Sequence, residues 1–306
     1  MYRRIAVAIP ARNEAANLPS CLAALRKAAD ALAQDIYVLV LANNCDDDTA
    51  AVVAEADHGG RLQLSLVERQ LSADMAHAGF ARRLVLDAAA DLLREPGDLL
   101  LSTDADTVVA EDWLTRTRAY FDQGFDAVAG LARLKPSELR GLPRNLRRRF
   151  ATLRRYDQAI TYLRASRDKA ESWPRHFYEG GASMALTLSA YRAVGGAPTP
   201  PVGEDKALFE AVRSIGGRVR HPLDVRVLTS SRLSGRALGG TSDTLCAWSR
   251  LDETAIIDGV KSIAESLDLK TSGFHGLTFA SLPAEVERAR QLVHAVRQSP
   301  DLAKVG

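Results

Sequence analysis

Apolar runs and segments with helical spacing alternate along residues 1–130, and this alternation constrains the fold more than any other feature. The helical segments are predicted at Ala15–Ala33, Thr49–Ala56, Ala76–Leu93 and Asp112–Phe121. The apolar runs between them predict buried strands at Ile5–Ile9, Tyr37–Leu41, Gln63–Val67, Leu99–Leu101 and Asp126–Gly130. Such an order is typical of an α/β fold with a mostly parallel sheet and helices on both faces.

The regularity weakens after Gly130, where loops rich in glycine and proline surround one apolar segment, Met184–Leu188. We expect a helix at Lys206–Ser214, a strand at Val219–Thr229 and an amphipathic C-terminal helix at Ala284–Arg297.

Bulk composition excludes several classes of protein. The formal net charge of +2 gives no reason to expect a nucleic-acid partner. The chain has three cysteines, at Cys21, Cys45 and Cys246. They are far apart and odd in number, which argues against a disulfide framework or a zinc site and favours a location in the reducing cytoplasm. The sequence lacks a segment apolar enough for a spanning helix, and its first apolar run is too short for a signal peptide, although contact with a membrane surface remains open.

Polar clusters follow three of the predicted strands, where open α/β sheets bind their ligands. In the third cluster, Asp104 and Asp106 flank one small residue after a buried strand. Paired carboxylates suit a hard cation such as Mg²⁺ or Mn²⁺, with phosphate oxygens completing the ligand set. The alternative is an acidic loop in which Asp106 caps the next helix.

The first two clusters favour nucleotide binding, with helix capping as the alternative. The segment Pro10–Glu14 begins a helix, whose free N–H groups suit a phosphate or a base, but Asn13 or Asn17 would also serve as a cap. Asn43 ends the second strand, where its amide oxygen would accept a ring N–H of a pyrimidine. In the turn that follows, we expect a cap from Asp48 or Thr49 and solvated side chains at Asp46 and Asp47.

A fourth cluster lies later in the chain. Glu204 and Asp205 precede a helix and suit a general base, although a carboxylate pair at a helix N-terminus is also stabilised by the helix dipole. Arg82, near the start of an earlier helix, could pair with a diphosphate.

An arginine run follows Gly130 and includes Arg144, Arg147, Arg148, Arg149, Arg154 and Arg155. It would suit an acidic lipid head group or a pyrophosphate-bearing acceptor. We favour a solvated face, which is the usual role of such runs.

Four stretches in order resemble the family 2 glycosyltransferases: IPARNE, NNCDDDTA, STDADT, and EGGASMALTLSAYRAVGG followed by GEDKALFEAV. The resemblance spans Ile5 to Thr229. It implies the GT-A fold, with a mostly parallel Rossmann-like sheet, an irregular acceptor-side half and C-terminal helices. It also implies inverting transfer of a sugar from a UDP- or GDP-sugar to a hydroxyl acceptor, dependent on Mg²⁺ or Mn²⁺.

The resemblance assigns roles to individual residues. It implies that Asp205 is the catalytic base and that Asp106 holds the metal. On the acceptor side it places Gly180, Gly181 and Glu204. At the nucleotide sugar it places Pro10, Arg12, Glu14, Asn43, Arg82 and Asp104. The corresponding regions are residues 1–130 for the nucleotide sugar, 131–235 for the acceptor and base, and 236–306 for a loop and helical extension.

The chain departs from the family pattern at several points. Asn43 stands where the family commonly has aspartate, and the Q-x-x-R-W motif of polymer-making members is missing, which favours transfer of a single sugar. His221 is the nearest candidate for a late metal-binding histidine, but we expect it to be a strand residue.

Two alternative functions stay open. One is a nucleotidyltransferase, although such enzymes usually carry a glycine-rich loop after the first strand and IPARNE contains no glycine. The other is a nucleotide-sugar-binding protein without turnover. A Rossmann dehydrogenase is disfavoured because no G-x-G-x-x-G follows the first strand.

Overall fold

The computed structural model describes residues 3–56, 59–168, 171–235, 239–269 and 276–298. Its contacts divide the chain into two compact units. The sheet unit comprises Met1–Lys135, Tyr178–Ser230 and Gly235–Gly240. The helical unit comprises Pro136–Phe177, Ser231–Ser234 and Thr241–Gly306. The division into donor-binding and acceptor-binding regions at residues 130 and 235 concerns function and stays a prediction.

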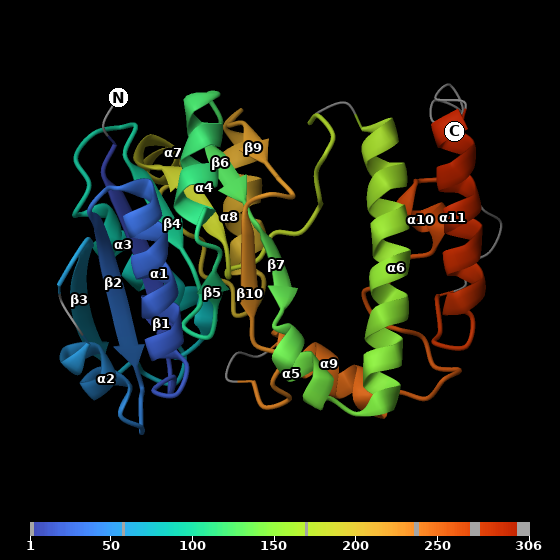
Figure 1. The fold of residues 1–306 in the computed structure, drawn as a ribbon, viewed down its shortest axis with the longest axis horizontal. Coiled ribbons are helices and arrows are strands. Elements are labelled where there is room, and N and C mark those ends of the chain that lie inside the picture. Colours follow the sequence, from blue (N-terminus) through green and yellow to red (C-terminus); the bar gives the residue numbers. More distant parts are fainter. Residues whose placement is uncertain (1–2, 57–58, 169–170, 236–238, 270–275, 299–306) are drawn as a thin grey trace. The chain divides into compact units, whose positions relative to one another are not determined.

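A seven-stranded sheet forms the centre of the sheet unit (Figure 1), in the order β3-β2-β1-β4-β8-β6-β9. Its first four strands run parallel, while β8 runs antiparallel to both β4 and β6. The strands are β1 (Ile5–Ala11), β2 (Ile36–Asn43), β3 (Leu62–Arg69), β4 (Leu99–Ser102), β6 (Ala127–Ala129), β8 (Met184–Thr187) and β9 (Val219–Arg220). The predicted mostly parallel sheet is therefore confirmed.

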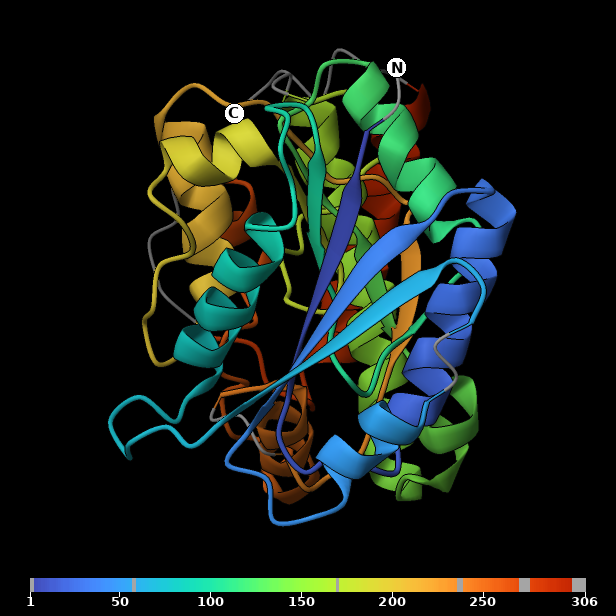
Figure 2. The ribbon, with the colours of Figure 1, turned by 90° about the vertical axis from the view of Figure 1, so that its left-hand side faces the viewer.

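Helices cover both faces of this sheet, and Figure 2 shows α1 and α3 on opposite sides of the strands. One apolar core packs α1, α2 and α4 on one face, and a second packs α3, α7 and α8 on the other. The helices of the sheet unit are α1 (Leu18–Leu32), α2 (Thr49–Glu55), α3 (Ala78–Ala90), α4 (Trp113–Asp122), α7 (Leu188–Ala193) and α8 (Glu204–Ser214).

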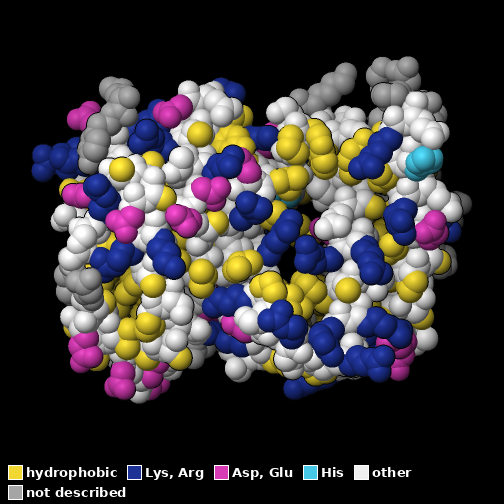
Figure 3. Space-filling view, in the orientation of Figure 1, with side chains coloured by type: hydrophobic (Ala, Val, Ile, Leu, Met, Phe, Trp, Pro, Cys, Tyr) yellow, Lys and Arg dark blue, Asp and Glu magenta, His cyan; other side chains and the backbone are white. Residues whose placement is uncertain are grey.

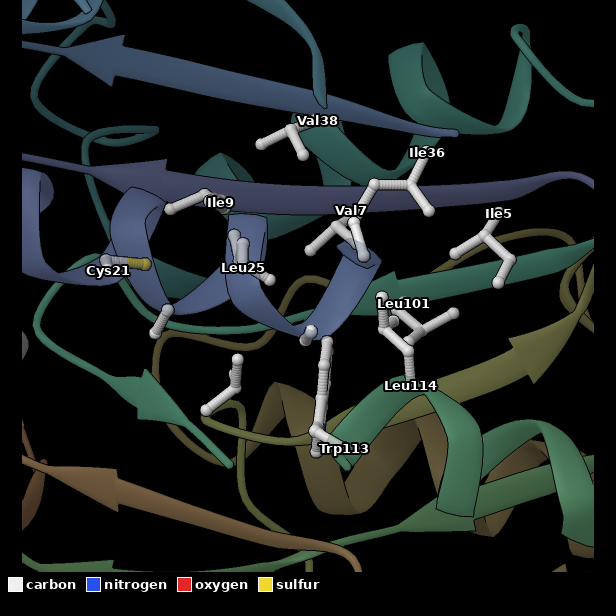
Figure 4. Close-up of a cluster of buried hydrophobic side chains, with 14 of the residues drawn as sticks. Ile5, Val7, Ile9, Cys21, Leu25, Ile36, Val38, Leu101, Trp113 and Leu114 are labelled. Atoms are coloured by element: carbon white, nitrogen blue, oxygen red, sulfur yellow. The ribbon is translucent and has the colours of Figure 1, made fainter. Parts of the chain in front are cut away.

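The period of two in β1 explains this two-layered core. Ile5, Val7 and Ile9 point to one face, where Figure 4 shows them near Leu25 of α1 and Trp113 of α4. The alternate small residues of β1 face the second core. Because both faces are buried, the strand is apolar throughout, as parallel strands usually are.

The sheet unit also contains a second sheet of three strands, in the order β5-β10-β7. Its strands are β5 (Val108–Val109), β7 (Leu131–Leu134) and β10 (Arg226–Thr229). The expected single strand at Val219–Thr229 is therefore wrong, because β9 pairs with β6 in the large sheet and β10 pairs in the small one. Pro222 lies between them and has no N–H to donate to a ladder, so continuous pairing ends there.

The helical unit contains a long helix that was not predicted from the sequence. Its helices are α5 (Pro136–Gly141), α6 (Arg144–Arg167), α9 (Thr241–Arg250), α10 (Ile263–Ser266) and α11 (Leu282–Gln298). α6 places Leu153, Tyr156 and Ile160 in a core shared with α11. The expected helix at Ala284–Arg297 lies within α11.

One arginine of the predicted solvated run is buried in this unit. Arg149 donates from Nη2 to Glu253 at 2.8 Å, and its guanidinium lies 4.4 Å from the ring centroid of Phe279. The solvated interpretation is therefore wrong for Arg149, whereas Arg144, Arg147, Arg148, Arg154 and Arg155 are exposed.

Candidate active site

The ends of β1 and β2 bring the first two polar clusters together. The parallel register sets Ala11 opposite Ala42, so Arg12 and Asn43 follow as neighbouring positions at one edge of the sheet. Asn43 is buried at 4% exposure, while Arg12 is exposed. Pro10 lies inside β1, opposite Leu41.

Direct hydrogen bonds tie the loop after β1 to the turn after β2. The backbone N–H of Glu14 donates to Thr49 Oγ1 at 2.8 Å, and that of Asp46 donates to Asn13 Oδ1 at 2.7 Å. Asn13 adopts the left-handed conformation, with φ at 55°, a region that asparagine tolerates better than most residues. Glu14 is buried, and its Oε2 accepts from Asn17 Nδ2 at 2.7 Å.

These contacts correct the expected capping. Asp48 and Asn17 occupy N-cap positions, but neither side chain caps its helix. Asp47, which was expected to be solvated only, instead accepts from the backbone N–H of Thr49 and of Ala15, each at 3.0 Å. A pattern of three consecutive aspartates does not reveal which of them binds the backbone.

The loop between β4 and β5 holds Asp104 and Asp106 where the chain passes from the large sheet to the small one. Both residues are partly exposed. Thr229, at the end of β10, donates from Oγ1 to Asp106 Oδ1 at 3.2 Å. The expected alternative of an N-cap at Asp106 is wrong, because α4 has Asp112 at that position.

The buried thiol of Cys21 lies next to this loop. Cys21 is buried in α1, and its Sγ lies 3.7 Å from the backbone oxygen of Asp104. Burial, followed by the negative charges of Asp106 and Asp104, raises the pKa of Cys21 to about 12, against a smaller opposing effect of Lys135. Two carboxylates on this short loop suit a cation.

Arg82 of α3 connects this loop to the fourth cluster. Its side chain is only 6% exposed, and its Nη2 donates to Asp104 Oδ1 at 2.8 Å while its Nε donates to Glu204 Oε1 at 3.1 Å. Its Nη1 donates to Ser102 Oγ at 2.9 Å and to the backbone oxygen of Gly181 at 3.2 Å. Four of the five N–H donors of a guanidinium are thus used inside the protein.

The charge of Arg82 is secured by these partners. Burial alone would lower its pKa, but Asp104 and Glu204 outweigh burial, so that the pKa is raised. From the sequence we expected Arg82 at a diphosphate and Glu204 on the acceptor side. In the structure the Glu204 side chain is 8% exposed and paired with Arg82, so both residues lie behind the partly exposed carboxylates Asp104 and Asp205.

The two glycines Gly180 and Gly181 bring backbone close to these side chains. Asp205 Oδ2 accepts from the backbone N–H of Gly181 at 3.0 Å. A Cβ on Gly181 would overlap the guanidinium of Arg82, and a Cβ on Gly180 would lie 3.9 Å from Asp205 Oδ2. Only glycine at position 181 lets Arg82 occupy its place.

Asp205 has the environment of a base. It is the second residue of α8, and its pKa is raised by burial and then by the neighbouring charge of Glu204. Hydrogen bonds from the backbone of Lys206 and Gly181 and the charge of Arg82 oppose this shift without cancelling it. A carboxylate that holds a proton more readily than usual is better matched to proton abstraction near neutral pH.

His221 lies outside the strands and pairs elsewhere. Its Nε2 lies 2.9 Å from Glu179 Oε1, and Arg213 Nη1 donates to the same oxygen at 2.5 Å. Burial would raise the pKa of Glu179, but hydrogen bonds from His221 and Arg213 lower it. The expectation that His221 is a strand residue is wrong, since β9 ends one residue earlier.

The donor set around Asp106 fits a divalent metal. No group of three or more His, Cys, Asp or Glu side chains gathers as a metal cage among the residues that the structure describes. Mg²⁺ and Mn²⁺ commonly take one or two carboxylates and complete their ligands with substrate phosphate. Asp106, with the partly exposed Asp104 beside it, meets that requirement.

The family of the chain follows from a comparison with known proteins. A family model described as "Glycosyltransferase like family 2" matches residues 3–249, which include all four motifs. The chain belongs to this family. It is therefore an enzyme of the glycosyltransferase class. The resemblance to family 2 that the four motifs indicated is confirmed.

Solved structures of other glycosyltransferases share the fold. The mannosyltransferase PcManGT from Pyrobaculum calidifontis, in complex with GDP-Man and Mn²⁺, is 20% identical with a TM-score of 0.54, over 98% of this chain and 76% of that one. S. aureus TarS 1-349 in complex with UDP-GlcNAc is 15% identical with a TM-score of 0.51, over 99% and 76%. TarS 1-349 in complex with UDP is 15% identical with a TM-score of 0.52, over 96% and 91%. The predicted GT-A fold is confirmed.

The helices were also compared with what a membrane-spanning segment requires. Among the described residues, none of the helices combines the length and the apolar character needed to cross a bilayer. The expected cytoplasmic location stays a prediction.

Proposed function

We propose that this glycosyltransferase moves a single sugar from a UDP- or GDP-sugar to a hydroxyl acceptor, with inversion and with dependence on Mg²⁺ or Mn²⁺. The observation that carries the proposal is the position of Arg82 between Asp104 and Glu204. One buried guanidinium thereby connects the loop suited to the donor diphosphate with the first turn of α8, which contains the proposed base. The structural relatives bound to GDP-Man and UDP-GlcNAc support a nucleotide-sugar donor.

The donor side would use the loops after β1, β2 and β4. The buried Asn43 amide suits a hydrogen bond to the base, and Pro10, Arg12 and Glu14 frame the loop beside it. Asp104 would approach the ribose. We assign these contacts from the motifs and from their convergence at one edge of the sheet.

The acceptor side would use Asp205 as the base. Asp205 takes the proton from the attacking hydroxyl, which then displaces the nucleoside diphosphate from the opposite face of the anomeric carbon. The backbone N–H of Gly181 orients the Asp205 carboxylate, and the Arg82–Glu204 pair fixes the start of α8. Asp106 would hold the metal, which would neutralise charge on the leaving diphosphate.

Donor turnover tests the proposal. The purified protein is incubated with UDP- and GDP-sugars, with Mn²⁺ and then with chelator, and nucleoside diphosphate release is followed. We expect metal-dependent release with one donor, lost in Asp106→Ala and retained in Glu111→Ala, which removes an exposed carboxylate from the same region. Asp205→Asn should abolish transfer while donor binding is retained.

The products separate the competing activities. Release of pyrophosphate instead of nucleoside diphosphate would assign the chain to the nucleotidyltransferases. Tight donor binding without release, under every acceptor and metal condition, would favour a binding protein. With an acceptor identified, the anomeric configuration of the product by NMR tests inversion, and retention of configuration would refute the assigned role of Asp205.

A further inference from the structure

The helical unit carries a cationic face that includes none of the residues named for the proposed sugar transfer. Five of the exposed arginines of α6 fall within about 120° of the helix circumference at 100° per residue: Arg144, Arg147, Arg148, Arg154 and Arg155. The opposite side of α6 is buried in the apolar core of the unit. Figure 3 shows Lys and Arg side chains gathered over α5 and the adjoining end of α6.

Among the described residues, no carboxylate neutralises the charge of these five arginines. Within the part of the chain that the structure describes, none of the five forms an ion pair with a carboxylate. The first turn of α6 contains no acidic residue. Glu138 of α5 accepts from the backbone N–H of Ser231 at 2.7 Å.

The cluster works against the stability of its own helix. Cations near a helix N-terminus oppose the helix dipole, and like charges spaced four residues apart, as in Arg144 and Arg148, repel. In the isolated protein, both effects lower the stability of α6. An anionic partner would remove both penalties.

A hollow between α5 and α6 adds an apolar component. It has a volume of about 240 Å³ and is lined by Leu139, Arg140, Arg147, Phe150, Ala151 and Arg154. Its walls are mostly carbon, and three of the six lining residues are arginines. This combination suits a ligand in which phosphate adjoins hydrocarbon, as it does in a phospholipid.

We infer that the arginine face of α6, with Arg140 of α5 beside it, binds the anionic surface of a phospholipid membrane. The arginines contact lipid phosphates, and the apolar hollow receives the adjoining carbon chain. Clusters of Lys and Arg on a helix are attracted to the anionic surface of a bilayer, by about 1 kcal/mol for each residue near the surface. The inference does not depend on the residues assigned to the sugar transfer, because none of the residues named for the donor, the metal or the base lies on this face.

Vesicle co-sedimentation tests this inference. The full chain is mixed with vesicles of phosphatidylcholine alone, or of phosphatidylcholine with phosphatidylglycerol, at low and at physiological salt. We expect binding to the anionic vesicles only, weakened by salt because the Debye length shortens. Arg147→Gln/Arg154→Gln should reduce the affinity by about fivefold for each arginine removed.

The matched control is Arg288→Gln/Arg290→Gln, which makes the same change in net charge on exposed arginines of α11 that are paired with glutamates. It should bind like the unaltered chain, and thermal unfolding should show that both double variants are folded. Equal loss in both, or no loss in Arg147→Gln/Arg154→Gln, would overturn the inference. So would tighter binding to single-stranded RNA than to anionic vesicles, if it is lost in the same variant.

Discussion

Replacing Arg82 by methionine should destabilise the sheet unit strongly. The change removes a guanidinium whose side chain is 6% exposed and leaves the Glu204 carboxylate, 8% exposed, without the cation it contacts at 3.1 Å. Removing one partner of a buried ion pair typically costs about 3–5 kcal/mol, because the remaining charge stays buried. Methionine fills most of the vacated volume, so the cost comes chiefly from the unpaired charge.

Urea unfolding followed by circular dichroism measures this loss. Arg82→Met/Glu204→Gln removes the unpaired charge as well, so it should be more stable than Arg82→Met alone. The two single variants and the double variant form a cycle that isolates the coupling between the side chains. Arg83→Met is the control, because Arg83 is adjacent on α3 but its side chain is 32% exposed and pairs with Asp87. Such a pair contributes about 0–1 kcal/mol.

A loss below about 1 kcal/mol in Arg82→Met, comparable with that of an exposed ion pair, would refute the reasoning. It would show that water or another cation replaces the guanidinium. A double variant less stable than Arg82→Met would also contradict it, because Glu204 would then be stabilising without its partner.

Two further predictions concern the same site. Because burial and then Glu204 raise the pKa of Asp205, and a base must be ionised, the acid limb of kcat/KM should lie above the pH expected of an ordinary aspartate; a limb at or below that pH would contradict the assignment. Gly181→Ala should displace Arg82 and lower kcat/KM by about a hundredfold, an effect typical of small misplacements in active sites. Gly141→Ala, whose added methyl would meet nothing, should leave kcat/KM unchanged, and equal effects of the two changes would contradict the steric argument.

The sheet could be predicted because its signal is local. The run Tyr37–Leu41 falls within β2, and the run Leu99–Leu101 within β4, since both strands are buried on two faces and therefore apolar throughout. The position of Asp104 and Asp106 also followed from the sequence, because the residues that end parallel strands gather at one edge.

The contacts of Arg82 could not be predicted in the same way. Its partner Glu204 lies 122 residues away and its partner Gly181 lies 99 residues away, and no periodic pattern links them. The sequence showed an arginine near a helix start, which suits a phosphate equally well. Ser102 and Thr229 were missed for a similar reason, since a hydroxyl at a strand end carries no signal of its partner.

The long helix α6 was missed because its composition is dominated by arginine. Its buried positions include Arg149 and Tyr156, whose polar ends reach Glu253 and the backbone oxygen of Lys261. A pattern that counts only apolar residues therefore finds too narrow a stripe to predict a helix. Long side chains that bury their carbon and hydrogen-bond their ends replace part of that stripe.

The charges of the site favour the proposed divalent cation. Asp104, Asp106, Glu204 and Asp205 are connected to one another by Arg82, by adjacency in the chain or by a shared loop, and Arg82 supplies a single positive charge. A nucleoside diphosphate is itself an anion, so it would be repelled by this excess of carboxylates. The buried guanidinium has most of its donors committed to the protein and cannot move toward the phosphates without breaking the bonds that orient the start of α8. A cation held at Asp106 would compensate the charge on the donor side and leave the arrangement around Asp205 intact.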